Sequence, residues 1–97
     1  MPKSLLQSVI AFIENPQTSS YEMDDALDEC RECLAILEMR SRGTVPTDRG
    51  PRQILQVPEA GQAAIEVRRA LGHLELGRKP EALGHLQAAL RLVNHWL

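Results

Sequence analysis

The fold is decided by residues 70–92, ALGHLELGRKPEALGHLQAALRL, which contain two apolar patterns separated by Gly77 and Pro80. Glycine commonly ends a helix, and proline is favoured in the first turn of the next one. After Pro80 the large apolar residues recur in steps of three and four, which is typical of a helix that packs along its whole length. The spacing predicts a helix over 80–96, with a seam of Leu83, Leu86, Leu90, Val93 and Leu97 and a second row of Ala82, Ala89 and Trp96 beside it.

The segment before Gly77 has the same helical period. Its apolar residues fall on one face at the i, i+3, i+4 spacing of an amphipathic helix, and Pro58 stands where a first turn would begin. We expect a helix over 59–76 whose inner face consists of Ala60, Ala63, Ala64, Val67, Ala70, Leu71 and Leu74.

Residues 43–58 interrupt the helical period with two glycines and three prolines. The sequence therefore predicts a long central loop, with a short turn around Ile54, Leu55 and Val57 that docks on the helices. Connections of this length are uncommon inside a compact domain and often have a functional role.

A further helix is predicted over 20–42. Ser19 and Glu22 have the spacing of a capping box, in which the two side chains bind free backbone N–H groups at a helix start. Asp24 and Asp25 follow, where the helix dipole favours negative charge. The expected buried stripe is Met23, Ala26, Leu27, Cys30, Cys33, Leu34 and Leu37, and Gly43 is the expected end.

The first predicted helix covers 4–14 and places five apolar residues on one stripe: Leu5, Leu6, Val9, Ile10 and Ile13. Four such helices in 97 residues form one domain, residues 1–97. The predicted fold class is all-α, either a four-helix bundle or two packed helical hairpins with the long loop at 43–58.

The charge is unevenly distributed along the chain. Residues 1–39 contain eight acidic and two basic side chains, whereas residues 40–97 contain five acidic and nine basic ones. This polarity suits pairing between two surfaces, within one chain or between two chains. The longest apolar run near the start is too short to span a bilayer, and no signal-peptide cleavage site follows it. We therefore expect a cytoplasmic protein without a membrane span.

Cys30 and Cys33 allow three interpretations. Both fall on the predicted apolar stripe, where free cysteine behaves as a small hydrophobic residue. A redox pair needs a helix N-terminus to lower the thiol pKa, and acidic neighbours oppose that. A zinc site would need ligands from His73, His85 and His95, whose spacing matches no common finger. Core packing is the favoured interpretation, with no metal and no cofactor.

The sequence contains no recognisable catalytic arrangement, and we expect a protein that is not an enzyme. It offers three surfaces for contact with a partner instead. These are an acidic side of the helix over 20–42, two arginines in the central loop and the outer side of the last helix. The candidate partner-binding residues are Asp25, Asp28, Glu29, Glu32, Arg49, Arg52, His85, Arg91 and Trp96.

Small and apolar residues in 70–92 stand where a helical hairpin crosses, with glycine at the turn: Ala70, Leu76, Gly77, Ala82, Ala89 and Leu90. In this the stretch resembles a single tetratricopeptide-type hairpin. It departs from that repeat at Glu66, Arg69 and Asn94, where the family has tryptophan, leucine and proline. About three stacked repeats usually bury a continuous core, so one hairpin must pack on the first two helices or on another chain. The resemblance implies binding of a peptide or partner protein without catalysis.

The same stretch is more faintly similar to a helix-turn-helix, with Arg78, Lys79, Gln87 and Arg91 left to contact DNA. Against this, both helices are long, His73 occupies a position that wants a small residue, and the chain is not basic overall.

The sequence therefore predicts a small protein-binding module of the adaptor, chaperone or inhibitor type, self-associated as a homodimer. The first alternative is a DNA-binding transcriptional regulator. The second is a zinc- or redox-responsive protein that uses the cysteine pair.

Overall fold

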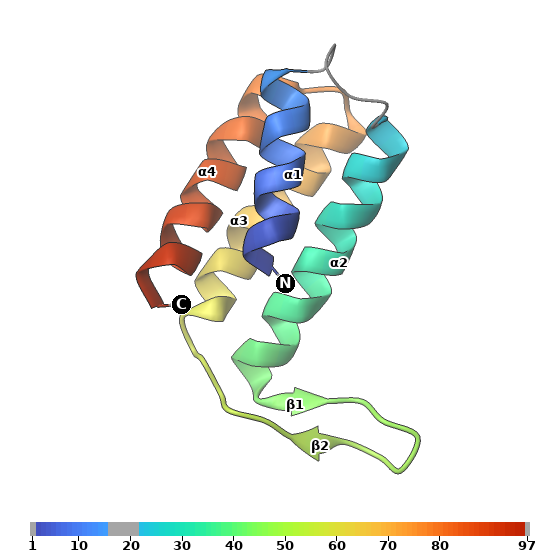
Figure 1. The fold of residues 1–97 in the computed structure, drawn as a ribbon, viewed down its shortest axis with the longest axis vertical. Helices are drawn as coiled ribbons and strands as arrows, with labels where there is room; N and C mark the ends of the chain where they lie inside the picture. The colour runs from blue at the N-terminus through green and yellow to red at the C-terminus, as the bar shows by residue number, and fades with distance from the viewer. Residues whose placement is uncertain (1, 16–21, 97) are drawn as a thin grey trace.

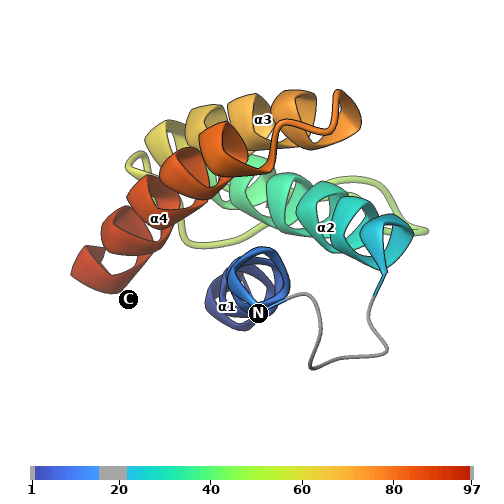
Figure 2. The same cartoon turned by 90° about the horizontal axis from the view of Figure 1, so that it is seen from above.

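The computed structural model describes residues 2–15 and 22–96, except for the side chain of Trp96, and contains four helices and a small hairpin (Figure 1). The elements are α1 (Pro2–Glu14), α2 (Met23–Arg42), β1 (Thr44–Val45), β2 (Arg52–Gln53), α3 (Ala60–Glu75) and α4 (Lys79–Trp96). Each helix packs against its neighbours in the ring α1, α2, α3, α4 (Figure 2). The predicted all-α class is confirmed, and the architecture is a four-helix bundle.

Helix α1 begins at Pro2, earlier than the predicted residue 4, because the fixed backbone angle of proline suits the first position of a helix. Its buried side chains face α2 and α4, between which the helix lies (Figure 2). The Nζ of Lys79 lies 5.2 Å from the ring centre of Phe12, a cation–π contact that joins α1 to the start of α4. The buried residues are Pro2, Leu6, Val9, Ile10 and Phe12.

Helix α2 begins at Met23 rather than at residue 20, and its cap differs from the predicted one. Glu22 is the N-cap residue and forms a reciprocal capping box with Asp25, whose carboxylate accepts the Glu22 backbone N–H at 2.9 Å. Ser19, the predicted cap residue, lies outside the described residues. The predicted end is confirmed, since Gly43 adopts a left-handed conformation there (φ 77°) and donates its N–H to the carbonyl of Met39.

The predicted central loop contains a two-stranded antiparallel hairpin that the sequence did not indicate. Thr44 pairs with Gln53 and Val45 with Arg52. The turn is closed by mutual backbone hydrogen bonds between Thr47 and Gly50. After β2, the Val57 N–H donates to the carbonyl of Arg40 and the Val57 side chain packs on the core, as expected, whereas Leu55 is 84% exposed. The hairpin extends past the C-terminal end of α2 (Figure 1).

Helices α3 and α4 form the predicted antiparallel hairpin, with Gly77 in a left-handed conformation at the turn. The inner face of α3 is as predicted, with only Leu71 less than fully buried. On α4 the fully buried line combines both predicted rows: Leu86 and Val93 come from the predicted seam, and Ala82 and Ala89 come from the row beside it. Leu83 and Leu90 of the predicted seam are only half-buried. Leu97 lies outside the described residues. The small side chains of alanine allow the two helix backbones to approach closely. No helix in the described part of the chain is long and apolar enough to cross a membrane.

Candidate functional site

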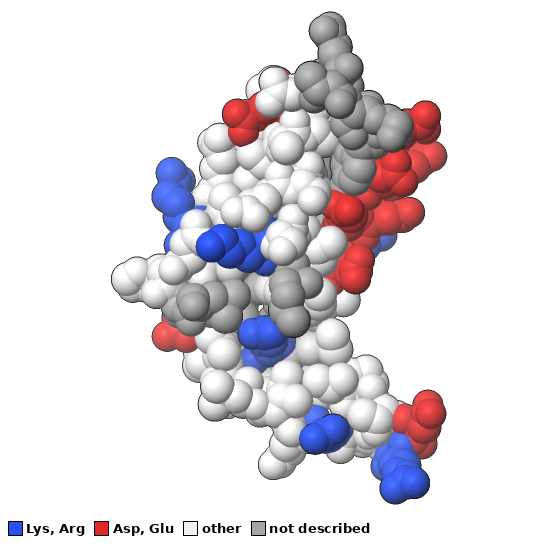
Figure 3. All heavy atoms as spheres, viewed as in Figure 1, with Lys and Arg blue, Asp and Glu red and all other residues white. Residues whose placement is uncertain are grey.

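Four of the predicted partner-binding carboxylates lie on the N-terminal half of α2, and we call them the acidic band: Asp25, Asp28, Glu29 and Glu32. Glu29 is half-buried and the other three are exposed. At about 100° per residue, the four fall within roughly a third of the helix circumference. Figure 3 shows acidic atoms gathered along the side of the molecule where α2 lies. The structure therefore brings these four predicted residues together.

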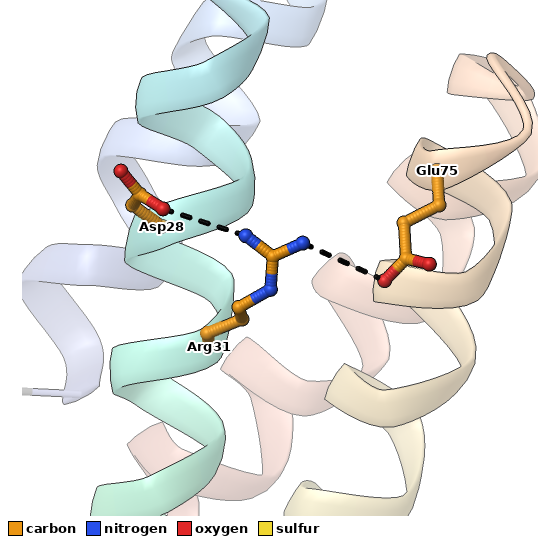
Figure 4. Close-up of polar contacts among 3 residues, drawn as sticks. All are labelled: Asp28, Arg31 and Glu75. Atoms are coloured by element: carbon orange, nitrogen blue, oxygen red, sulfur yellow. Dashed lines mark hydrogen bonds and ion pairs between the residues drawn. The ribbon is translucent and has the colours of Figure 1, made fainter.

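Arg31 borders the acidic band on the side of α3. Its guanidinium lies 3.4 Å from Oδ1 of Asp28 and 3.9 Å from Oε1 of Glu75 on α3 (Figure 4). Because all three side chains are at least half exposed, these ion pairs contribute little stability. Arg31 directs its guanidinium toward α3, so the side of the acidic band that faces away from α3 keeps its negative charge.

Arg49 and Arg52 lie in the hairpin, at its turn and at the start of β2, and both are exposed. The hairpin follows the C-terminal end of α2, whereas the acidic band lies on the N-terminal half (Figure 1). The structure therefore does not bring the two arginines to the acidic band of the same chain.

The predicted surface on α4 is divided. His85 is half-buried: its Nδ1 lies 2.7 Å from Oε2 of Glu66, and its ring stacks on that of His73 with 5.4 Å between the ring centres. Arg91 is exposed and lies about 120° around the helix from His85, since six residues separate them. The side chain of Trp96 is outside the described part. His85 thus belongs to the contact between α3 and α4, and Arg91 faces another direction.

Both cysteines are free thiols in the core, each 1% exposed. The Sγ of Cys33 lies 3.7 Å from the carbonyl oxygen of Pro2, which places it at the contact with α1. Burial is the main cause that raises the pKa of Cys30 to about 11 and that of Cys33 to about 12. Nearby acidic groups act in the same direction. The position and the pKa values agree with the core-packing interpretation and oppose the thiolate that redox chemistry needs.

We expect both thiols to resist alkylation in the folded protein at about pH 8, because a thiol reacts as its thiolate. Iodoacetamide labelling and mass spectrometry, with and without denaturant, measure this. Rapid labelling of Cys30 without denaturant would contradict the burial.

The raised pKa values also predict how the free energy of unfolding depends on pH. The stability that the two protonated thiols contribute is fully present below the ordinary thiol pKa of 9.0 and is lost as the pH rises toward about 11 and 12. In that range the folded state holds more protons than the unfolded chain.

The alternative functions find little geometric support. Within residues 2–15 and 22–96, no three His, Cys, Asp or Glu side chains are placed to hold a metal ion. His73 and His85 lie between α3 and α4, whereas the cysteines lie on α2, so the ligand set of the zinc alternative is not assembled there. Of the residues expected to contact DNA, Lys79 is half-buried against Phe12.

A groove that the sequence did not indicate lies between the C-terminal half of α2 and α3. Its lining residues are Glu38, Ser41, Arg42, Gly61, Ala64, Ile65 and Arg68. An added Cβ at Gly61 would lie 2.9 Å from the Ser41 hydroxyl oxygen, so the two helices are close at this level. The exposed Ile65 was the available signal, because it lies off the predicted inner face of α3.

Comparison of this chain with protein-family models, curated proteins and solved structures finds no match.

Proposed function

We propose that this chain is a small, non-catalytic protein-binding module whose acidic band receives a basic segment of a partner protein. The observation that carries the proposal is the band on one side of a well-anchored helix. Four side chains of α2 are fully buried beneath it: Ala26, Cys30, Cys33 and Leu37. A helix held in this way presents its carboxylates in a fixed arrangement, which gives specificity and a fast encounter with a basic partner.

Two further features support a contact function. The α3–α4 hairpin has alanines at its crossing and a glycine turn, which suits a tetratricopeptide-like module that binds a peptide or a protein. The free buried thiols suit a reducing compartment, so we place the module in the cytoplasm. Within this proposal the chain acts as an adaptor, a chaperone or an inhibitor.

The test is purification of bound polypeptides from the native host with wild-type protein and two charge-reversed variants. Glu32→Lys changes the acidic band, and Glu81→Lys makes the same change at an exposed position in the first turn of α4. We expect a defined polypeptide with a basic segment to bind both wild type and Glu81→Lys. Its binding to Glu32→Lys is expected to be at least about tenfold weaker, which corresponds to a loss of about 1.4 kcal/mol of binding free energy. Circular dichroism checks that both variants keep their helices.

Equal capture by all three proteins would refute the role of the acidic band. Capture of DNA in place of a polypeptide, with an affinity that falls steeply as salt increases, would support the transcriptional alternative instead.

A further inference from the structure

The surface shared by α2 and α3 is crossed by two ion pairs that lie about two helical turns apart. Arg31 of α2 pairs with Glu75 of α3, and Glu38 of α2 pairs with Arg68 of α3. The groove described above adjoins the second pair. We call the solvent-facing surface that contains both ion pairs and the groove the α2–α3 face.

The α2–α3 face carries two small residues between the ion pairs. Ala35 lies four residues after Arg31 and three before Glu38, and Gly72 lies four after Arg68 and three before Glu75. Helical spacing therefore places both small residues between the two ion pairs. Both are exposed, and a Cβ added at Gly72 would meet no atom within 4 Å. Another helix can approach this part of the surface closely.

The two ends of the face have opposite charge compositions. At one end the carboxylates of Asp28 and Glu75 surround the guanidinium of Arg31. At the other end the guanidinium groups of Arg42 and Arg68 lie with the carboxylate of Glu38 around one groove. Two acids and one base give a net charge of −1, and two bases and one acid give +1. The face is thus complementary to itself when turned end for end.

Two exposed apolar side chains also lie on this side of the molecule. Large exposed hydrophobic residues in the described part are Leu55, Ile65 and Leu76, and the last two lie on α3 and at its C-terminal end. Eleven residues separate Ile65 from Leu76, which is three turns of helix, so both fall on one line with Gly72 between them. Ile65 is 53% and Leu76 68% exposed. This line belongs to the α2–α3 face, because Ile65 lines its groove.

We propose that a second copy of this chain packs on the α2–α3 face, with each helix antiparallel to its counterpart and the two-fold axis crossing near Ala35 and Gly72. Asp28 and Arg42 are each seven residues from Ala35, so each lies opposite the other in the second copy. By the same alignment, Arg31 of one copy lies opposite Glu38 of the other copy, and Arg68 of one copy lies opposite Glu75 of the other. In such an interface both copies contribute the same surface patch, so the two-fold symmetry leaves no patch free and the assembly stops at a dimer.

The dimer goes beyond the proposed function and does not depend on it. Asp25, Glu29 and Glu32 of the acidic band lie about 40 to 100° around α2 from Asp28, on the side away from α3. They stay accessible when the α2–α3 face is covered. Because the dimer is measured on the purified protein alone, its failure leaves the partner-capture experiment unaffected.

The first test is sedimentation velocity over a concentration series with wild type, Ile65→Arg and Gln87→Arg. Ile65→Arg puts a charge into the proposed interface, and Gln87→Arg puts the same side chain at an exposed position of α4. In the proposed dimer the second copy covers Ile65, and a charge buried there without a partner is costly, so we expect Ile65→Arg to raise the dimer dissociation constant by at least about tenfold and Gln87→Arg to leave it unchanged. A wild type that stays monomeric into the millimolar range overturns the proposal, as does an unchanged Ile65→Arg dimer.

A charge exchange tests the antiparallel arrangement. Asp28→Arg alone faces Arg42 of its copy, and Arg42→Glu alone faces Asp28, so each variant repels itself and is expected to be monomeric. In a mixture, every contact between the two variants joins opposite charges, and a heterodimer is expected. Native mass spectrometry separates the variants by mass, and circular dichroism verifies that both fold.

Each outcome of the mixture is decisive. A heterodimer supports the antiparallel arrangement. Two monomeric variants that do not combine overturn it, because only the end-for-end alignment makes the two changes compensate. Variants that each form homodimers place the interface elsewhere.

Discussion

Replacing Leu86 by alanine is expected to lower the free energy of unfolding by about 3 kcal/mol, because the change leaves a cavity in the hydrophobic core of the bundle. Leu86 is fully buried on α4, among residues that include three alanines and a valine of zero exposure: Ala70, Ala82, Ala89 and Val93. Helices that already touch through alanine have little room to collapse into the space. Thermal unfolding followed by circular dichroism should show a midpoint lower by about 15 °C.

Leu90→Ala is the matched control for this prediction. Leu90 belongs to the same helix and to the seam predicted from the sequence, but it is only half-buried. We expect a loss of about 1 kcal/mol, since the side chain gives up less contact and water can fill its place. Equal losses for the two leucines would contradict the observed orientation of α4 and restore the predicted one.

The second large effect is expected at Gly43, where alanine should cost about 3 kcal/mol. The residue has a φ of 77°, which is unfavourable for any side chain by about 1–2 kcal/mol. An added Cβ would also lie 2.9 Å from the Cβ of Gln56. The backbone around it is fixed by two hydrogen bonds, Gly43 to Met39 and Ile54 to Gly43, each 2.9 Å long. The clash therefore cannot be relieved by a small rotation.

Gly77→Ala separates the two contributions. Gly77 has nearly the same backbone angle, with a φ of 74°, but no atom lies within 4 Å of an added Cβ. We expect a loss of about 1 kcal/mol there, from the conformational penalty alone. Urea unfolding of both variants measures the difference. If Gly43→Ala costs no more than Gly77→Ala, the close contact between Gly43 and Gln56 is absent in solution.

The helices could be predicted from the sequence because each has a clear period and definite end signals. Gly43, Gly77, Pro58 before α3 and Pro80 in the first turn of α4 act locally, so their effect is visible without tertiary information. The start of α2 was predicted too early because Ser19 and Glu22 have the capping-box spacing, while Glu22 and Asp25 form the actual box. The two capping-box signals overlap in the sequence, and local spacing alone does not choose between them.

The rotation of α4 and the hairpin in the central loop were beyond a sequence prediction. Leucines and alanines both form an apolar row on α4, and the buried line takes Leu86 and Val93 from one row and Ala82 and Ala89 from the other. The spacing within one helix does not report which side meets the neighbouring helices. The strands β1 and β2 have two residues each, too few for a period of two to be recognised.

The candidate surfaces were predicted in part. The acidic band follows from spacing on one helix, and the structure keeps its four residues together. His85 could not be placed from the sequence, because its contacts with Glu66 and His73 depend on how α3 and α4 cross. The α2–α3 face was missed for the same reason: its ion pairs join residues thirty or more positions apart.

The position of α1 between α2 and α4 has a consequence for the order of synthesis on the ribosome. Of these four helices α1 is translated first, yet its second neighbour, α4, emerges after the other three. Until α4 leaves the exit tunnel, the nascent chain must keep part of the apolar side of α1 uncovered, including Phe12 and its contact site for Lys79. A ribosome-bound chain halted before α4 should therefore recruit general chaperones, and one halted after α4 should release them.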